Sequence, residues 1–423
     1  MRKTIAVGYL FFCLFFFVRM VGLSYADSAE VLPKGIFRTN IETNLYFPVE
    51  KRFDPDGHTE DVSHDFNSTL DSNIFPALSP LDNIMGGPGS AIIGTSIVSF
   101  KYNFTDLIVG LQYGVTDRLT VGVKVPYWWQ KTDVNETRLN TADATVGKNP
   151  LYGTPGDPFG GAPIIPLGVG GVPLSTDDVQ SLIDGGLYIN GKLAIPGFKY
   201  KRIKTWSDSG LSDIEAGGRY QYLKNDNWRL AFTGAVRFPT GKVDSPDNLV
   251  DLGFGPGVYA ILFRLNNDYT GIKNLVLNAT IKYDLTLSDK QKKRVPSNAN
   301  NPIAPVSNEE DVSRNIGDIM EFEGSGSYQF SEGWNLELRY KYGSKTRDDV
   351  SGSKKLNYKS LEDETDWTYN LFSTGISYST IPLFQAKKFS LPLTASVSYE
   401  NVFAGSNNFL KQQFFSLKLA VFF

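Results

Sequence analysis

The sequence predicts an all-β protein, a transmembrane antiparallel β-barrel of about 12 strands with long extracellular loops and short periplasmic turns. Apolar and polar residues alternate along many runs, which is typical of strands with one apolar face. These runs span 10 to 15 residues, against about 5–6 for a typical soluble strand and roughly 9–11 for a tilted membrane strand. The links between them are alternately short and long, as in membrane-spanning barrels.

The first segment, 1–26, has the three regions of a signal peptide. Arg2 and Lys3 form a charged start, an apolar run follows, and small residues stand at Ser24 and Ala26. This arrangement predicts cleavage after Ala26 and export of the barrel domain 27–423. The single cysteine, Cys13, falls within the segment, so we expect no disulfide framework in the exported chain.

Charge and composition exclude some classes of protein. The net charge of the whole chain is −3, and it becomes more negative once the basic signal peptide is removed. A mildly acidic exported chain is a poor nucleic-acid binder, so we expect no nucleic acid as a partner. The 29 Phe, 21 Tyr and 40 Gly are typical of a large β-chain.

Alternation and turn residues predict the strands one by one. The expected strands are 35–47, 92–115, 118–129, 210–223, 227–239, 253–265, 274–287, 315–330, 334–344, 366–380, 389–401 and 409–423. Four links, 48–91, 130–209, 288–314 and 345–365, are long, and the first two are the main loop insertions in the barrel. Trp228 and Trp334 each follow a short turn, where an interfacial aromatic girdle is expected.

The last ten residues, "FFSLKLAVFF", predict the strand that closes the barrel. Their odd-numbered residues are apolar and would face lipid, while Lys418 would face the lumen. Closure is required, because an open sheet edge in hydrocarbon leaves backbone groups unpaired. The terminal Phe423 resembles the signature that barrel assembly machinery recognises.

One run, 92–115, changes parity along its length. Its apolar residues are even-numbered up to Phe104 and odd-numbered from Leu107 onward. Either a bulge at Thr105–Asp106 resets the register, or these two residues form a tight hairpin. We favour the bulge. A single strand of this length would extend about 80 Å and project from the membrane as a long ribbon.

Two stretches, "YGVTDRLTVGVKVPYW" (113–128) and "GLSDIEAGGRYQYLKNDNWRLAFTGAVRFPTGK" (210–242), resemble an outer-membrane family named for a meta-pathway of phenol degradation. "LPKGIFRTNIETNLYF" (32–47) and "RFDPDG" (52–57) are similar to that family's opening, whereas "GLSD" stands where the family usually has a second glycine. The resemblance implies barrels in the outer membrane of a Gram-negative-type bacterium that pass hydrophobic or aromatic compounds.

Strand parity places ionic side chains of both signs in the lumen. The candidate channel-lining residues are Arg219, Arg237, Glu321, Glu323, Glu337, Arg339 and Lys341. Such charges either line an aqueous path and set its selectivity, or pair with one another and fill the interior. Because both signs are present, we expect no strong preference for anions or cations.

Within the loop 130–209, the stretch 150–174 is rich in Pro and Gly yet apolar. It could fold into the barrel mouth as a gate, present an apolar patch, or pack on its neighbours. A short helix at 175–183 with Ser175 or Thr176 as N-cap would anchor it.

These features predict a channel for passive passage of small, hydrophobic or aromatic compounds. The alternatives are a plugged barrel that acts as receptor or adhesin through its loops, and an outer-membrane hydrolase. The only histidines, His58 and His64, share one acidic loop, and no G-x-S-x-G motif is present. We therefore expect no enzyme, no cofactor and no metal site; the expected partners are membrane lipid, solutes and the assembly machinery.

Overall fold

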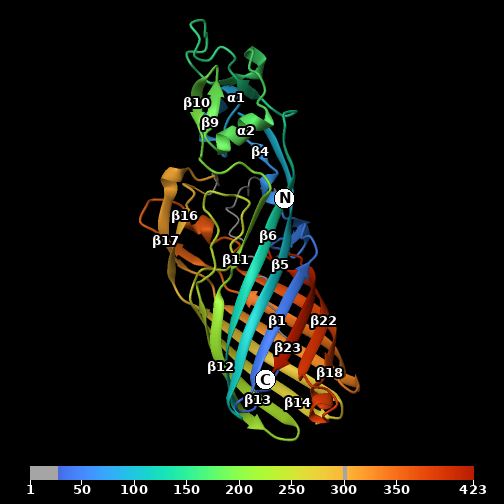
Figure 1. Ribbon diagram of the computed structural model, residues 1–423. Coiled ribbons are helices and arrows are strands. Elements are labelled where there is room, and N and C mark those ends of the chain that lie inside the picture. Colours follow the sequence, from blue (N-terminus) through green and yellow to red (C-terminus); the bar gives the residue numbers. More distant parts are fainter. Residues whose placement is uncertain (1–26, 299–302) are drawn as a thin grey trace, which may run out of the picture.

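The computed structural model describes residues 27–298 and 303–423, and the expected signal peptide 1–26 lies outside the described residues. The described chain forms a closed 12-stranded antiparallel β-barrel, which confirms the predicted fold class (Figure 1). The barrel strands are β1 (Phe37–Tyr46), β5 (Gly94–Thr116), β6 (Leu119–Asn140), β12 (Ile214–Lys224), β13 (Trp228–Phe238), β14 (Ala260–Ile272), β15 (Leu275–Thr286), β18 (Ile319–Ser331), β19 (Trp334–Lys345), β21 (Trp367–Ser379), β22 (Leu393–Gly405) and β23 (Gln413–Phe422).

Strands that follow one another in this series pair in the sheet, and β23 pairs with β1 in antiparallel register to close the barrel. Leu419 lies opposite Ile41, and Lys418 lies opposite Glu42. The predicted closing strand is therefore confirmed. Short links gather at one end of the barrel, here called the turn end, which is periplasmic in outer-membrane barrels. Most of the longer links lie at the other end, here called the loop end (Figure 1). The exceptions are the link 380–392, which lies at the turn end, and the link 406–412, which lies at the loop end and is shorter.

The remaining elements lie in the links. They are the strands β2 (Lys51–Phe53), β3 (Thr59–Asp61), β4 (Thr69–Leu70), β7 (Val146–Lys148), β8 (Ile164–Pro166), β9 (Gly186–Ile189), β10 (Lys192–Pro196), β11 (Trp206–Leu211), β16 (Asp289–Arg294), β17 (Glu309–Asn315) and β20 (Asp349–Ser351), and the α-helices α1 (Ser79–Met85), α2 (Thr176–Ile183) and α3 (Ile381–Gln385). Single 3-10 turns occur at His64–Phe66, Pro76–Leu78, Leu167–Val169, Val306–Asn308 and Tyr358–Leu361. Among the described helices, none is long and apolar enough to cross a membrane.

The hairpin β5–β6 projects beyond the barrel as a ribbon, as expected for a strand of this length (Figure 1). The favoured bulge at Thr105–Asp106 is wrong, because the pairing with β6 runs through these residues without a shift and they do not form a hairpin. Even-numbered residues point inward on both sides of this point: Phe104 is 3% exposed and Ile108 is 4% exposed. The alternation of inward and outward residues is therefore unbroken. What changes along the strand is which of its two faces has apolar surroundings.

Lipid and the link residues explain this change of parity. Near the turn end the outer face of β5 meets lipid, so the odd-numbered Val109 and Leu111 are exposed there. Nearer the loop end the inner face of the ribbon packs on an apolar core, where the ring of Phe100 lies against Phe66 at 5.3 Å. We call residues 48–91 and 141–205 the ribbon domain.

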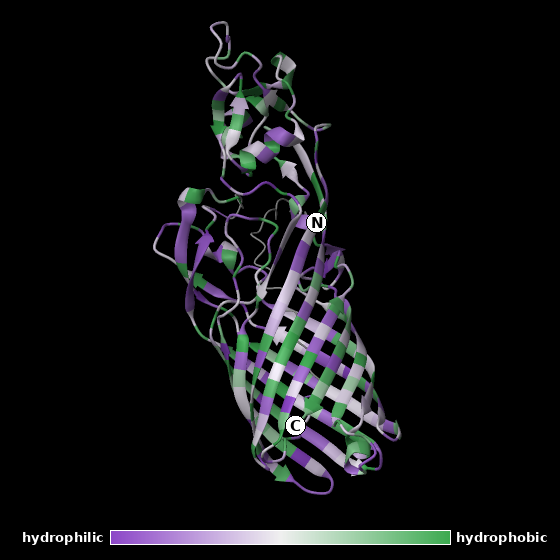
Figure 2. Cartoon of the chain, viewed as in Figure 1, coloured by the Kyte–Doolittle hydropathy of each residue, from purple (hydrophilic) through white to green (hydrophobic). Residues whose placement is uncertain are grey.

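Figure 2 shows hydrophobic and hydrophilic residues alternating along the barrel strands. Aromatic pairs ring both ends of the wall. Trp228 lies 4.8 Å from Tyr269 and Trp334 lies 4.7 Å from Tyr378 at the turn end, as the girdle prediction requires. Aromatic pairs also lie toward the loop end, among them Tyr127–Trp129 and Phe238–Tyr259. Such belts mark the two membrane interfaces.

Several boundaries differ from the prediction. The strand expected at 118–129 continues as β6 to Asn140, so the loop expected at 130–209 begins later in the chain. The strand expected at 253–265 is β14, Ala260–Ile272, so 239–259 is a further long link. This link was missed because its residues 253–259 continue the apolar pattern, yet three glycines among them keep the backbone irregular. Its residue Val250 accepts a 2.7 Å hydrogen bond from Thr132 Oγ1 of β6, so the link packs onto the base of the ribbon.

The stretch 150–174 belongs to the ribbon domain and does not enter the barrel mouth (Figure 1). Lys148 and Val172 exchange backbone hydrogen bonds of 2.7 and 2.9 Å, and Ile164 and Ile165 are buried. The expectation of a constriction formed by this stretch is therefore wrong, because its apolar residues are used to fold the ribbon domain. The predicted helix is confirmed as α2, with Ser175 as N-cap in a capping box with Asp178.

Candidate channel interior

Alternation along the barrel strands carries ionic side chains into the interior. On β18 and β19, Glu323 and Arg339 are buried, while their chain neighbours Phe322 and Leu338 are 41% and 50% exposed on the outer face. A one-residue step in a strand changes the face that a side chain occupies. The structure thus places all seven predicted residues on lumen-facing positions, and that they line a solute path stays a prediction.

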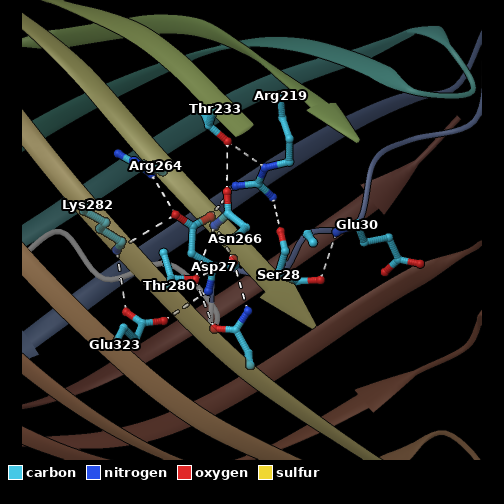
Figure 3. A network of polar contacts seen from close by, with 12 residues as sticks. Asp27, Ser28, Glu30, Arg219, Thr233, Arg264, Asn266, Thr280, Lys282 and Glu323 are labelled. Atoms are coloured by element: carbon cyan, nitrogen blue, oxygen red, sulfur yellow. Dashed lines mark hydrogen bonds and ion pairs between the residues drawn. The ribbon is translucent and has the colours of Figure 1, made fainter. Parts of the chain in front are cut away.

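The centre of the interior is occupied by Asp27, whose carboxylate lies among three cations (Figure 3). Arg219 of β12 is hydrogen-bonded to it, Arg264 Nη1 of β14 lies 3.3 Å from it, and Lys282 Nζ of β15 lies 4.0 Å from it. The backbone nitrogen of Asp27 donates to Glu323 Oε1 at 3.1 Å. We call these five residues the Asp27 site.

The backbone around Asp27 is also held by the barrel wall. The carbonyl oxygen of Asp27 accepts from Asn266 Nδ2 at 2.5 Å and from Thr280 Oγ1 at 3.1 Å. These two side chains come from β14 and β15, adjacent strands whose residues 266 and 280 are register partners. Every polar group of Asp27 in the described structure therefore has a partner from the wall.

The residues that follow Asp27 cross the lumen toward the turn end. Asp268 of β14 accepts from Ser28 Oγ at 2.7 Å and from the Ala29 nitrogen at 3.0 Å. Further along, the nitrogen of Leu32 donates to Thr120 Oγ1 of β6 at 2.8 Å. We call residues 27–34 the lumen segment. It is fixed to several strands on different sides of the barrel, so it obstructs the interior at this level.

Nearer the loop end, Arg237 of β13 bridges two acids. Its Nη2 atom lies 2.7 Å from Glu215 Oε1 and 2.9 Å from Asp284 Oδ2. On the neighbouring wall, Lys341 Nζ lies 3.4 Å from Glu323 Oε2, and both side chains are about 1% exposed. Buried charges are tolerated when paired in this way.

A second cluster lies on the wall formed by β19, β22, β23 and β1. Arg339 Nη2 donates to Glu400 Oε1 at 2.5 Å, and Lys418 Nζ lies 3.5 Å from Glu42 Oε2. Glu337 accepts a hydrogen bond of 3.4 Å from Ser377 Oγ. The predicted residues thus divide: Glu337 and Arg339 belong to this second cluster, whereas Arg219, Glu323 and Lys341 lie at or beside the Asp27 site.

The remaining predicted residue, Glu321 of β18, lies beside the Asp27 site. Its Oε1 atom accepts from Tyr369 Oη at 2.5 Å, and its Oε2 atom lies 4.0 Å from Lys282 Nζ. Most of these predicted residues are therefore ion-paired, and Glu337 accepts a hydrogen bond from a neutral hydroxyl group. Such an interior can stabilise a charged group that replaces one of its own partners.

Sequence reasoning missed Asp27, Arg264 and Glu400. Arg264 and Asn266 share the parity of the inward residues of β14, but the expected strand ended at 265 and the pattern across it was not followed. Glu400 likewise has inward parity on β22 and is fully buried. Asp27 gave no signal, because a short segment that is held by tertiary contacts has no periodicity.

The two histidines lie in the ribbon domain, outside these clusters. His58 Nδ1 is 3.6 Å from Asp54, and His64 Nε2 is 3.7 Å from Glu60. Both side chains are well exposed, as expected for a solvated acidic loop. Within 27–298 and 303–423, no three potential ligands from His, Cys, Asp and Glu come together as a metal site.

Known structures share this barrel. A COG4313 outer membrane channel of Pseudomonas putida F1 superposes with a TM-score of 0.53 at 11% identity, covering 95% of this chain and 100% of that one. Two further structures are less similar: a FadL homologue of Pseudomonas aeruginosa (TM-score 0.33, 9% identity, 92% of this chain and 90% of that one) and the toluene transporter TodX of P. putida (TM-score 0.32, 10% identity, 95% and 94%).

The fold is that of an outer-membrane β-barrel. No curated protein matches the chain by sequence. A family model described as "Putative MetA-pathway of phenol degradation" matches residues 152–419, which is more than half of the chain. This match confirms the resemblance found in the sequence motifs, and the chain belongs to that family.

Proposed function

We propose that the protein is an outer-membrane channel for the passive passage of small molecules, with hydrophobic or aromatic compounds as its solutes. The observation that carries the proposal is the combination of a closed apolar wall with an interior of ionic side chains of both signs. A barrel that needed only to be a solid anchor could fill its interior with apolar side chains at lower cost. Paired charges instead give a polar interior that water and solutes can share when the lumen segment moves.

Two comparisons with known proteins bear on the class of solute. The family description refers to phenol degradation, and a solved relative of the same fold is described as an outer membrane channel. Both support a role in supplying small organic compounds to the cell.

Solute passage is tested by reconstituting the refolded protein in planar bilayers and liposomes. We expect ion conductance with weak selectivity, and faster entry of phenol into liposomes that contain the protein than into protein-free liposomes of the same lipid. A matched control is E136Q, which changes an exposed carboxylate on the ribbon and should conduct like the unaltered protein. Absence of conductance in every refolded form, including one that lacks the lumen segment, would refute the channel.

A second candidate is a receptor or adhesin that acts through the ribbon domain. This domain has its own apolar core and presents exposed apolar side chains, among them Ile84 (70% exposed) and Tyr188 (59% exposed). Exposed apolar groups beyond the membrane favour a contact surface. Replacement of the ribbon beyond Asn103 and Lys131 by a tight turn would abolish such binding and leave conductance intact.

A further inference from the structure

We propose that the Asp27 site is an internal carboxylate-binding site, which the protein's own Asp27 occupies and for which small carboxylate solutes compete. A solute that wins this competition releases the lumen segment. The inference rests on the proposed channel function and names the chemical group that opens it.

Arg219 supplies the first argument. Among the described residues, Asp27 provides the one carboxylate within ion-pair distance of its guanidinium, and Arg219 Nη1 also donates to the Ser28 oxygen at 2.5 Å. Departure of the lumen segment would remove both partners and leave a partly buried cation with the hydroxyl of Thr233 at 3.0 Å. A buried cation without a counter-charge is costly, so an external anion would be drawn to it.

Geometry supplies the second argument. Arg219, Arg264 and Lys282 come from three strands, β12, β14 and β15, and approach the carboxylate from different directions (Figure 3). Register fixes two of them, because Arg264 lies opposite Lys282 in the sheet. The three cations are therefore held in place by the barrel and not by Asp27. The site persists when Asp27 leaves, which is what a binding site for an exchangeable group requires.

Charge balance supplies the third argument. Five cations near the site each lie within ion-pair distance of at least one acid: Arg219, Arg237, Arg264, Lys282 and Lys341. Arg264 also has Glu215, and Lys282 also has Glu321 and Glu323, so both keep an acid when Asp27 leaves. Arg219 does not keep one among the described residues, and a monovalent carboxylate is the group that would replace its lost counter-charge.

The nitrogen of Asp27 supplies the fourth argument. It lies 3.1 Å from Glu323 Oε1. Cleavage after Ala26, as the sequence predicts, would turn this nitrogen into an α-ammonium group, so both charged ends of the residue would be bound by the wall. A solute that displaces these two charged groups frees this end of the mature lumen segment, and the rest of the segment is held by hydrogen bonds such as those to Asp268 and Thr120.

Release of the lumen segment can be measured without conductance. The exported chain contains no cysteine, and Ala29, which is fully buried in the lumen segment, can be replaced as Ala29→Cys. We expect its reaction with a water-soluble thiol reagent to be slow in folded protein. Benzoate should accelerate it about tenfold, because it competes for the site, whereas the neutral isostere benzamide should not.

Two variants in the A29C background test which group is recognised. D27N removes the carboxylate at almost constant shape, so the thiol should react about tenfold faster without any solute. R219Q should react faster too and should lose its response to benzoate. E136Q, which changes an exposed carboxylate on the ribbon, is the matched control and should behave as A29C. Heat-dependent mobility in gels verifies that each variant is folded.

The outcomes separate the site from the channel. Equal rates for A29C and A29C/D27N, or equal effects of benzoate and benzamide, would overturn the carboxylate site even if the protein conducts. Acceleration by benzoate alone would support the site even if no form conducts, in which case the channel function would fail. Parallel conductance records in benzoate and benzamide complete the comparison.

Discussion

The lipid-facing band can be located with one substitution, Leu338→Arg. Leu338 lies on the outer face of β19 and is 50% exposed. It stands four residues beyond Trp334 at the turn end, which is about 14 Å along the strand at 3.4 Å per residue. For a strand tilted by about 45°, this is about 10 Å along the membrane normal, near the middle of an apolar band about 25 Å tall.

An arginine near the middle of such a band destabilises an outer-membrane barrel by about 2–4 kcal/mol. We expect this loss for L338R in reversible guanidinium unfolding from lipid vesicles. The matched control is Ile84→Arg in α1 of the ribbon domain, where an apolar side chain of even greater exposure meets water, so the change should be within about 0.5 kcal/mol. Equal losses for L338R and I84R would show that the band identified here does not face lipid.

Three further predictions concern the interior, the link 239–259 and the ribbon. E400A should lower the free energy of unfolding by about 3–5 kcal/mol in the same assay, because Arg339 loses its buried partner. The double variant R339L/E400L should recover most of this stability. A smaller loss of stability for E400A than for the double variant would contradict the prediction. Burial raises the pKa of Asp251 to about 7, with Asp244 adding to the rise and Lys201 and Lys242 opposing it. The folded state then holds a proton that the unfolded chain releases near pH 4, so stability should fall as pH rises from about 4 to about 7, and D251N should flatten this slope. G94V should expose the ribbon domain to limited proteolysis while the barrel stays protected. A Cβ at this position (φ +140°) would lie 2.5 Å from the Asn140 oxygen of β6 and disturb the pairing of the two ribbon strands. Cleavage at the unaltered rate would refute this prediction.

Local sequence patterns predicted much of the fold. The side-chain period of a strand is two, so Leu338 and Arg339 must face opposite sides wherever the strand lies. The same rule, together with the need for closure in a bilayer, identified β23 as the partner of β1. The aromatic residues after the short turns, Trp228 and Trp334, marked the turn end for a similarly local reason.

Patterns failed where the surroundings changed along one element. Phe104 and Leu107 lie on opposite faces of a regular strand, and their shared apolarity reflects lipid on one side and the ribbon core on the other. A bulge is the natural inference when the environment is assumed to be uniform. The link 239–259 was hidden for a related reason, since a short apolar run is compatible with either a strand or a packed loop.

The sequence by itself determined the barrel, its closing strand and the inward side of the seven predicted ionic residues, because these follow from a two-residue period and from the solvent on either face. Only the tertiary structure decided which charges meet. Arg219 and Asp27 are 192 residues apart in the chain, and no local pattern relates them. Their contact arises because the closed wall brings β12, β14 and β15 around a segment that has no strand pattern of its own, and burial then requires each charge to find a partner.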